Sequence, residues 1–255
     1  MPDHDQALAS AFDGQAARFE RAPVQSNPAM LHRLIQVADL PSGGLVLDAG
    51  CGPGLVSETL LRAGYRVVGV DLSSEMIDRA RKRCADFGAR ASFEQQSLFD
   101  TFLAGPFDGA ISRFVLHHTP DPMSFVRRQL ELLRPGGILA VCDHTTDPDA
   151  VRAAWHQEIE RGRDRTHTRN LTPGGMVDLL AAAGLTDLRL SEESYVLDFD
   201  EWFDRGTQSE DKATVRQRLL SGASARGFRP LLQDDGRVRI EGCIAIVRGV
   251  KPLRE

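Results

Sequence analysis

Residues 44–54, "GLVLDAGCGPG", decide the fold, together with "YRVVGVD" at 65–71. Each begins as a short apolar run typical of a buried strand, and the first run closes in a turn with glycine at alternate positions. Glycines at a strand-to-helix turn let the backbone approach a ligand and aim helix N–H groups at it. Asp48 lies just before the turn, and Asp71 ends the second run. The pattern predicts a ligand site at the ends of two neighbouring strands.

Strands and helices alternate around this stretch, which predicts βαβ units with right-handed crossovers and a parallel sheet. The expected strands are 44–50, 65–71, 89–96, 107–118 and 138–144, and the helices between them are 55–64, 73–88 and 121–133. Two later strands, at 185–199 and 236–250, are expected to pair as a hairpin that closes the sheet. The predicted fold is therefore α/β, with a doubly wound, seven-stranded and mostly parallel sheet.

No repeat or low-complexity linker divides the 255 residues, so one domain over 1–255 is expected. Phe12, Phe19 and the run 30–34 suggest an amphipathic helical lid within 1–40. Residues 41–145 form the expected ligand-binding core. Helical segments at 146–171 and 198–222 are interpreted as insertions on the substrate side.

Composition narrows the classes of function. A formal net charge of −5 gives no basic footprint for nucleic acid, and no apolar run approaches the roughly 20 residues of a membrane-spanning helix. The N-terminus is polar and lacks the apolar centre of a signal peptide. Four scattered cysteines without a CxxC pair favour a reducing cytoplasm. We expect a monomer or a homodimer.

Two cofactor classes use a glycine turn of this kind. A dinucleotide site needs G-x-G-x-x-G, but Leu55 stands where the third glycine belongs. A carboxylate at Asp48 would repel a pyrophosphate and attract a cation, and S-adenosylmethionine carries a sulfonium and an ammonium. Asp71 can bind ribose hydroxyls in either class. The balance favours the methyl donor, and an NAD-dependent dehydrogenase is the alternative.

At these motifs the chain resembles the class I S-adenosylmethionine-dependent methyltransferases, over about residues 10–145. "LVLDAGCGPG" and "VVGVDLSSEMIDRAR" look like their first two motifs, while "FDGAISRFVLHHTPDP" and "LLRPGGILAVCD" look like the later ones. The resemblance implies a Rossmann-like methyltransferase fold and S-adenosylmethionine as cofactor. "AFDGQAARFERAP", "SRFVLHHTPDP" and "RDRTHTRNLT" are most similar to a small-molecule branch that includes ubiquinone and menaquinone C-methyltransferases. That similarity implies a small-molecule methyl acceptor.

The resemblance also implies a set of cofactor-binding residues. They are Phe19, Asp48, Ala49, Gly50, Cys51, Gly52, Asp71, Leu72, Met76, Ser97, Leu98 and Arg113. One departure concerns the adenine. The family usually has Gly-Asp-Ala after the third strand, with the Asp bonding the adenine amino group, whereas this chain has Gln-Ser-Leu at 96–98. A hydroxyl without charge assistance would bond that group more weakly.

Methyl transfer to an acidic O–H or C–H also needs a base. The candidates are His117, His144 and His167, with His118 and Asp143 beside them at the strand ends. No metal site is expected, because Asp143 alone is a poor set of oxygen ligands. The run that nucleic-acid amino-methyltransferases carry after the fourth strand, Asn/Asp-Pro-Pro-aromatic, does not occur. A non-catalytic S-adenosylmethionine-binding protein stays a second alternative, and O-, C- and N-methylation remain open.

Overall fold

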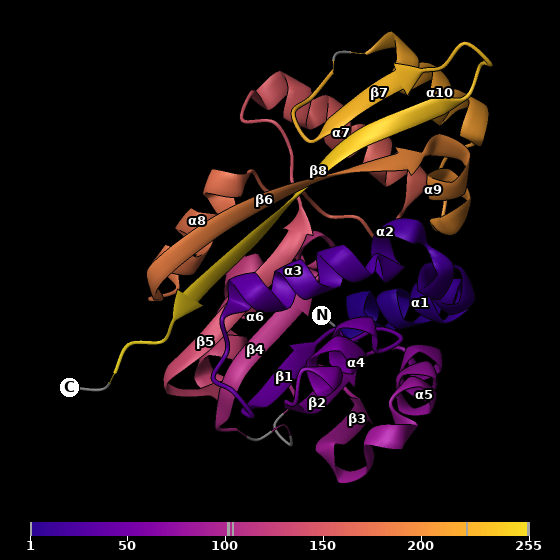
Figure 1. The fold of residues 1–255 in the computed structure, drawn as a ribbon. Helices are drawn as coiled ribbons and strands as arrows, with labels where there is room; N and C mark the ends of the chain where they lie inside the picture. The colour runs from indigo at the N-terminus through magenta and orange to yellow at the C-terminus, as the bar shows by residue number, and fades with distance from the viewer. Residues whose placement is uncertain (1, 101–102, 104, 223, 254–255) are drawn as a thin grey trace.

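Within residues 2–100, 103, 105–222 and 224–253, which this computed structural model describes, eight strands form one sheet (Figure 1). The order is β3-β2-β1-β4-β5-β8-β6, and β7 pairs with β8 off this path. The first five strands pair in parallel, whereas β8 runs antiparallel to β5, β6 and β7. The strands are β1 (Leu45–Ala49), β2 (Arg66–Asp71), β3 (Ala91–Gln95), β4 (Phe107–Arg113), β5 (Leu133–His144), β6 (Thr186–Asp198), β7 (Phe228–Leu232) and β8 (Val238–Val250).

The predicted α/β sheet is confirmed, but the count of seven strands was one short. The missed strand is β7, five residues that include Pro230 and pair with β8 alone. A short edge strand with a proline gives no clear periodic signal. The two late strands do pair antiparallel, yet they are no simple hairpin, because α9, α10 and β7 separate them along the chain and β8 lies inside the sheet.

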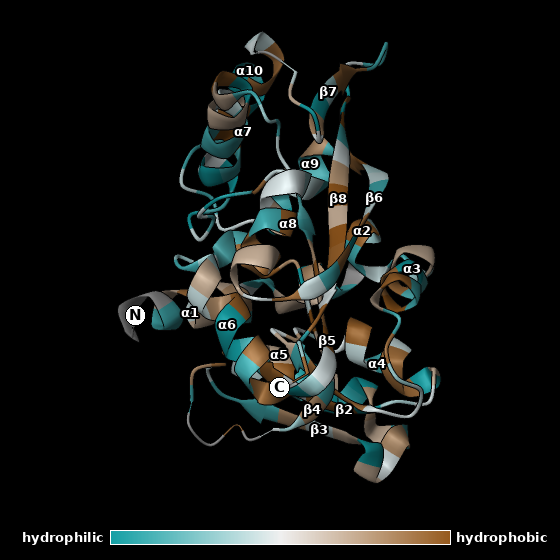
Figure 2. Ribbon diagram, turned by 90° about the vertical axis from the view of Figure 1, so that its left-hand side faces the viewer, coloured by the Kyte–Doolittle hydropathy of each residue, from teal (hydrophilic) through white to brown (hydrophobic). Residues whose placement is uncertain are grey.

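Helices cover both faces of the sheet, as a doubly wound fold requires. Leu34 of α3 and Leu60 of α4 are fully buried in one apolar cluster, and Phe125 of α6 and Leu180 of α8 pack into the cluster on the other side. Figure 2 shows hydrophobic residues along central strands such as β8 and a mixture of hydrophilic and hydrophobic residues along the helices. The helices are α1 (Pro2–Arg21), α2 (Pro23–Ser26), α3 (Pro28–Ala38), α4 (Leu55–Arg62), α5 (Ser74–Arg83), η1 (Ala85–Arg90), η2 (Leu116–His118), α6 (Pro122–Leu132), α7 (Ala150–Arg163), α8 (Pro173–Ala182), α9 (Phe199–Arg205) and α10 (Lys212–Ser221).

The helices of the two insertions gather at the far end of the long strands β6 and β8, together with β7 (Figure 1). Phe228 of β7 joins them, since its ring lies 6.1 Å from that of Trp155 and 5.6 Å from that of Trp202. The first helix, α1, contacts both α5 and α9. It therefore lies between the parallel part of the sheet and the inserted helices. Among the described residues, no helix combines the length and the apolar character needed to cross a membrane.

Candidate active site

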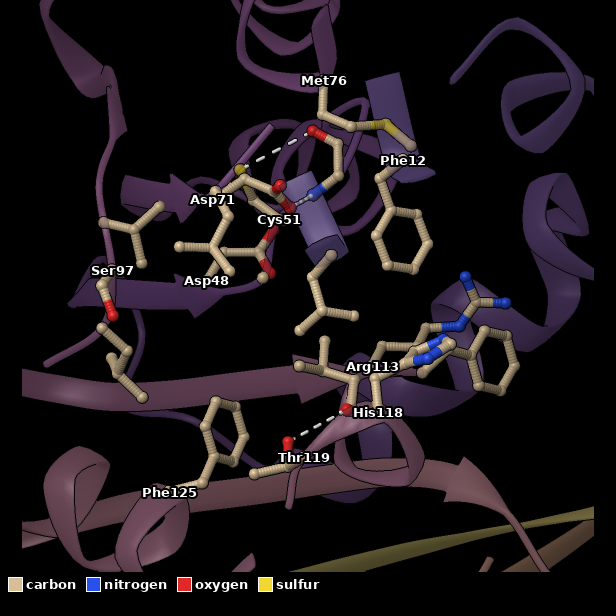
Figure 3. Close-up of a pocket in the computed structure, with 18 of the residues that line it drawn as sticks. Phe12, Asp48, Cys51, Asp71, Met76, Ser97, Arg113, His118, Thr119 and Phe125 are labelled. Carbon is tan, nitrogen blue, oxygen red and sulfur yellow. Dashed lines mark hydrogen bonds between the residues drawn. The ribbon is translucent and has the colours of Figure 1, made fainter. Parts of the chain in front are cut away.

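An open cavity with an empty volume of about 1320 Å³ lies at the carboxyl ends of β1 to β4 (Figure 3). We call it the first cavity. The order of the strands sets Ser97, Asp71, Asp48 and Arg113 along its floor, because these residues lie at or just after the ends of β3, β2, β1 and β4. Neighbouring strands are about 4.8 Å apart, so four strand ends span roughly 14 Å. This row suits an elongated ligand.

The glycine turn leaves bare backbone at the cavity. Gly50 has a φ of 75°, and a Cβ there would lie 2.5 Å from Cγ2 of Val115. Gly52 has a φ of 52°, and no atom lies within 4 Å of where its Cβ would be. Both residues line the first cavity. The turn therefore holds a left-handed conformation that favours glycine, and a side chain at 52 would occupy space left for a ligand.

Asp71 holds this turn to the start of α5. Its Oδ2 accepts a hydrogen bond from the Gly52 N–H and its Oδ1 accepts one from the Ser73 N–H, both at 2.9 Å. Ser73 in turn caps α5, because its Oγ accepts from the Met76 N–H. Burial raises the pKa of the Asp71 carboxyl, although these backbone donors oppose the rise. The same carboxylate thus shapes the turn and lines the cavity.

The negative charge of the Asp48 carboxylate is only weakly compensated by its neighbours. Its side chain is buried at the cavity floor, where Ser57 Oγ donates to its Oδ2 at 2.6 Å. Burial raises the pKa of the Asp48 carboxyl to about 7, and the negative charge of Asp71 adds to the rise. A cation bound beside it would stabilise the ionised form. The floor of the cavity therefore favours binding of a positively charged group.

Arg113 is a buried cation that lines the same cavity and also holds helix α2 in place. Its Nη2 donates to the Val24 carbonyl at 2.8 Å, and its Nη1 donates to the Gln25 carbonyl at 3.1 Å. Both acceptors belong to α2. A guanidinium at the end of β4 therefore anchors α2, and it lines the first cavity.

Phe114 forms part of a wall between this cavity and a second one. It has a φ of 60°, which is rare for a bulky side chain and marks a conformation held by its surroundings. Its ring stacks on His144 with centroids 4.3 Å apart, and the Arg113 guanidinium carbon lies 4.2 Å from its centroid. Four residues border both cavities: Phe19, Gln25, Phe114 and His118.

The second cavity is small, with about 30 Å³ of free space, and lies between the ends of β4 and β5, β6 and the inserted helices. Besides the four shared residues, its lining comprises Val24, His117, His144, Glu160, Arg163, Asn170, Tyr195, Leu197, Trp202 and Arg205.

His117 and Asp143 form a buried pair at this cavity. His117 Nδ1 lies 2.6 Å from Asp143 Oδ1, and the His117 backbone N–H donates to Oδ2 at 3.1 Å. Burial alone would lower the pKa of the His117 imidazole, but the Asp143 carboxylate raises it above its ordinary value. The carboxylate thus fixes the ring and stabilises its protonated form.

The other histidines are held differently. Burial lowers the pKa of His144 to about 3 and that of His118 to about 3, and the charge of His117 adds to both shifts. His144 Nδ1 lies 2.7 Å from the Tyr195 hydroxyl oxygen. His167 lies behind the second cavity, with Nε2 2.7 Å from Gln157 Oε1, and it lines neither cavity.

The structure gathers most of the residues expected to bind the cofactor. All of them line the first cavity except Ala49, which is fully buried beneath the turn. Of the three candidate bases, His117 and His144 border the second cavity and His167 does not. Sequence reasoning did not single out several cavity residues of the N-terminal and inserted segments. These are Asp5, Leu8, Gln25, Glu160, Tyr195 and Arg205.

Comparison with known proteins agrees with this geometry. The profile of a family described as "Methyltransferase domain" matches residues 20–190, about two thirds of the chain. The chain belongs to this methyltransferase family. A class I S-adenosylmethionine-dependent methyltransferase was the family predicted from the motifs, and that prediction is confirmed.

Relatives of this methyltransferase-family chain include the ubiquinone biosynthesis O-methyltransferase of Xanthomonas axonopodis pv. citri, 37% identical over 116 residues. That alignment covers 45% of this chain and 48% of the relative, so the chain matches about half the length of this curated relative. The relative is named for O-methylation, whereas the motifs resembled C-methyltransferases.

Solved structures confirm the fold. The YcgJ protein of Bacillus subtilis aligns with a TM-score of 0.79 at 22% identity, covering 89% of this chain and 99% of that one. A phosphoethanolamine N-methyltransferase of Haemonchus contortus, solved in complex with S-adenosyl-L-methionine, aligns with a TM-score of 0.64 at 16% identity. It covers 94% of this chain and 57% of that one. At these identities the likeness concerns the fold alone.

The raised pKa of Asp48 makes the stability of this protein depend on pH. The folded value of about 7 exceeds the ordinary 3.8, so the folded chain retains a proton that the unfolded chain has lost between these pH values. We expect stability to fall as pH rises from 4 to 7, by up to about 4 kcal/mol from this group. Asp48→Asn should remove that part of the loss, measured by urea unfolding at pH 5 and pH 8. An unchanged difference between the two pH values would contradict the assignment.

Proposed function

We propose that this protein is an S-adenosylmethionine-dependent methyltransferase that acts on a small-molecule acceptor. The observation that carries the proposal is the buried Asp48 carboxyl, poorly compensated, beside an open glycine turn in a chain of the methyltransferase family. When bound, S-adenosylmethionine supplies a methyl group activated by its sulfonium. A dinucleotide would instead bring a pyrophosphate to this carboxylate, which disfavours the dehydrogenase alternative.

The charges of the first cavity complement an amino-acid tail. Asp48 provides the negative charge for an ammonium, and Arg113 provides a positive charge for a carboxylate at the neighbouring strand end. Asp71 lies one strand further and can accept from ribose hydroxyls. This order of charges along the floor matches the order of groups in S-adenosylmethionine.

The adenine would lie at the end of β3, between apolar side chains and the carboxylate of Asp5. Met76 and Leu98 are buried and line this part of the cavity. Asp5 of α1 also lines it, with Oδ2 3.4 Å from the Ser97 Oγ. We infer that Asp5 accepts from the adenine amino group. The N-terminal helix would then replace the acid that Gln-Ser-Leu at 96–98 lacks.

The acceptor would enter at the second cavity, with its nucleophilic atom meeting the methyl group between Phe114 and His118, which border both cavities. The new bond to carbon forms as the bond from carbon to sulfur breaks, and adenosylhomocysteine leaves. In this arrangement α1 and α2 act as the lid, and the segments 146–171 and 198–222 supply the acceptor side of a single domain. Asp143 engages Nδ1 of His117, which leaves Nε2 to take a proton from the acceptor. Because the relatives are named for O-methylation, a phenolic or enolic oxygen is the first acceptor to test.

Titration calorimetry tests the cofactor. We expect S-adenosylmethionine to bind and NAD⁺ to give no heat. Affinity for S-adenosylmethionine should rise between pH 6 and pH 8 as Asp48 ionises. Asp48→Asn should weaken binding by at least about tenfold, the equivalent of 1.4 kcal/mol, and remove the pH dependence. Asp78→Asn, which changes an exposed carboxylate on α5, is the control. Binding of NAD⁺ in place of S-adenosylmethionine would refute the proposal.

Asp5 is tested with a base analogue. Adenosylhomocysteine has a donating amino group where S-inosylhomocysteine has an accepting carbonyl oxygen, so an acid at Asp5 should favour the former. We expect Asp5→Asn to reduce this preference at least about fivefold, since an amide can donate to the carbonyl. The comparison is made by calorimetry, again with Asp78→Asn as control. An unchanged preference would remove Asp5 from adenine recognition.

His117 is tested by turnover on a panel of phenols with S-adenosylmethionine. His117→Ala should lower kcat about 10²- to 10⁴-fold, as expected for loss of a general base, and leave the affinity for adenosylhomocysteine intact. Wild-type kcat should rise with pH as His117 loses its proton, above the ordinary imidazole pKa of 6.5. Asp143→Asn should shift this rise to lower pH. His32→Ala, on the exposed face of α3, is the control. Full turnover of His117→Ala would assign the base elsewhere.

A further inference from the structure

The second cavity contains charges that methyl transfer does not use. Three ionisable side chains of the inserted helices border it, namely Glu160 and Arg163 of α7 and Arg205 of α9. Each is largely buried: the exposed fraction is 12% for the side chain of Glu160, 9% for that of Arg163 and 5% for that of Arg205. Buried charges require partners, so the partner of each shows what the cavity still lacks.

Two of the three are satisfied within the protein. Arg163 donates from Nε to the Trp202 carbonyl at 3.0 Å and from Nη1 to Asp164 Oδ2 at 3.3 Å. Glu160 lies 3.5 Å from His156 Nε2. Although burial opposes it, His156 and the neighbouring cations lower the pKa of the Glu160 carboxyl. These groups form internal pairs around the cavity.

Arg205 is not satisfied in this way. Within the part of the chain that the structure describes, its Nε has no hydrogen-bond partner, and its Nη groups donate to no protein acceptor. Its nearest carboxylate is Glu201, at 3.5 Å from Nε, whose side chain is 38% exposed to solvent. Its guanidinium carbon lies 5.8 Å from the centroid of Phe19, which borders both cavities.

The charge of Arg205 is therefore poorly compensated. Burial and the nearby Arg163 lower the pKa of Arg205 to about 10, so the guanidinium remains charged at neutral pH. A buried cation whose ion pair is with a partly exposed carboxylate, and whose Nε lacks a hydrogen bond, costs free energy that an anionic ligand would recover. The aromatic rings of Phe19, Phe114 and Trp202 border the same space and would contact a flat apolar ligand that enters it.

We propose that Arg205 binds a carboxylate of the methyl acceptor, so that the acceptor is a small aromatic acid with a nucleophilic oxygen. This inference rests on the proposed function and adds the substrate class. A guanidinium edge matches a carboxylate with two parallel hydrogen bonds. A phosphate monoester carries more charge and more acceptor oxygens than one guanidinium can satisfy, and Arg163 is already engaged by Trp202 and Asp164.

The test compares benzoate with benzamide, which has the same shape without the charge. Calorimetry is done on the full chain loaded with adenosylhomocysteine. We expect benzoate to bind at least tenfold more tightly than benzamide. Arg205→Met should abolish that difference without changing the affinity for adenosylhomocysteine, and Arg205→Lys should retain part of it. Arg161→Met, an exposed arginine on α7, should behave as wild type.

Each other result counts against the inference. Equal binding of benzoate and benzamide by the wild type would overturn it, and so would a benzoate preference that survives in Arg205→Met. Tighter binding of phenyl phosphate than of benzoate would overturn the choice of carboxylate. If Arg205→Met fails to fold, the wild-type ratio and the Arg205→Lys variant decide.

Different results would refute the proposed function and the proposed aromatic acid. A chain that binds neither S-adenosylmethionine nor adenosylhomocysteine would refute the proposed function. A chain that binds adenosylhomocysteine and shows no preference for benzoate would refute the aromatic acid alone.

Discussion

The site depends on one carboxylate that accepts from two backbone segments. Asp71 bonds the Gly52 N–H on one side and the Ser73 N–H on the other, and so joins the first glycine turn to the start of α5. Without these bonds, the turn would have no fixed relation to the next crossover. Because the strands are parallel, fixing two of their ends also sets the neighbouring ends of β3 and β4, and the row of polar groups on the cavity floor follows.

A second constraint separates the two cavities. The backbone of Phe114 is held in a conformation that its side chain disfavours, and its ring packs between His144 and Arg113. Arg113 belongs to the first cavity and His144 to the second, so one residue fixes the wall for both. Strain at such a position is stable only when packing on several sides determines it.

The sequence was sufficient for the parts of the site that follow from local pattern. Asp48, Gly50, Gly52 and Asp71 stand in one motif, and a parallel sheet brings their strand ends together. The sequence was also sufficient to predict the fold class. The short strand β7 was not predicted, because five residues that include a proline give no periodic pattern.

The remaining site residues could not be predicted, because they reach the site through long-range packing. Asp5 contacts Ser97 across more than ninety positions, and Arg205 comes from a helix whose docking no local signal specifies. His117, by contrast, was named as a candidate base, although its partner Asp143 could be paired with it only once β4 and β5 were side by side.

The two N-terminal helices are attached by bonds of different kinds. α2 is tied by the buried guanidinium of Arg113, whereas α1 is tied in part by ion pairs of partly exposed side chains, where Glu20 pairs with Arg79 and Arg83 of α5. Salt screens exposed charges far more than buried ones. We therefore expect rising ionic strength to weaken the attachment of α1 to α5 before that of α2 to β4.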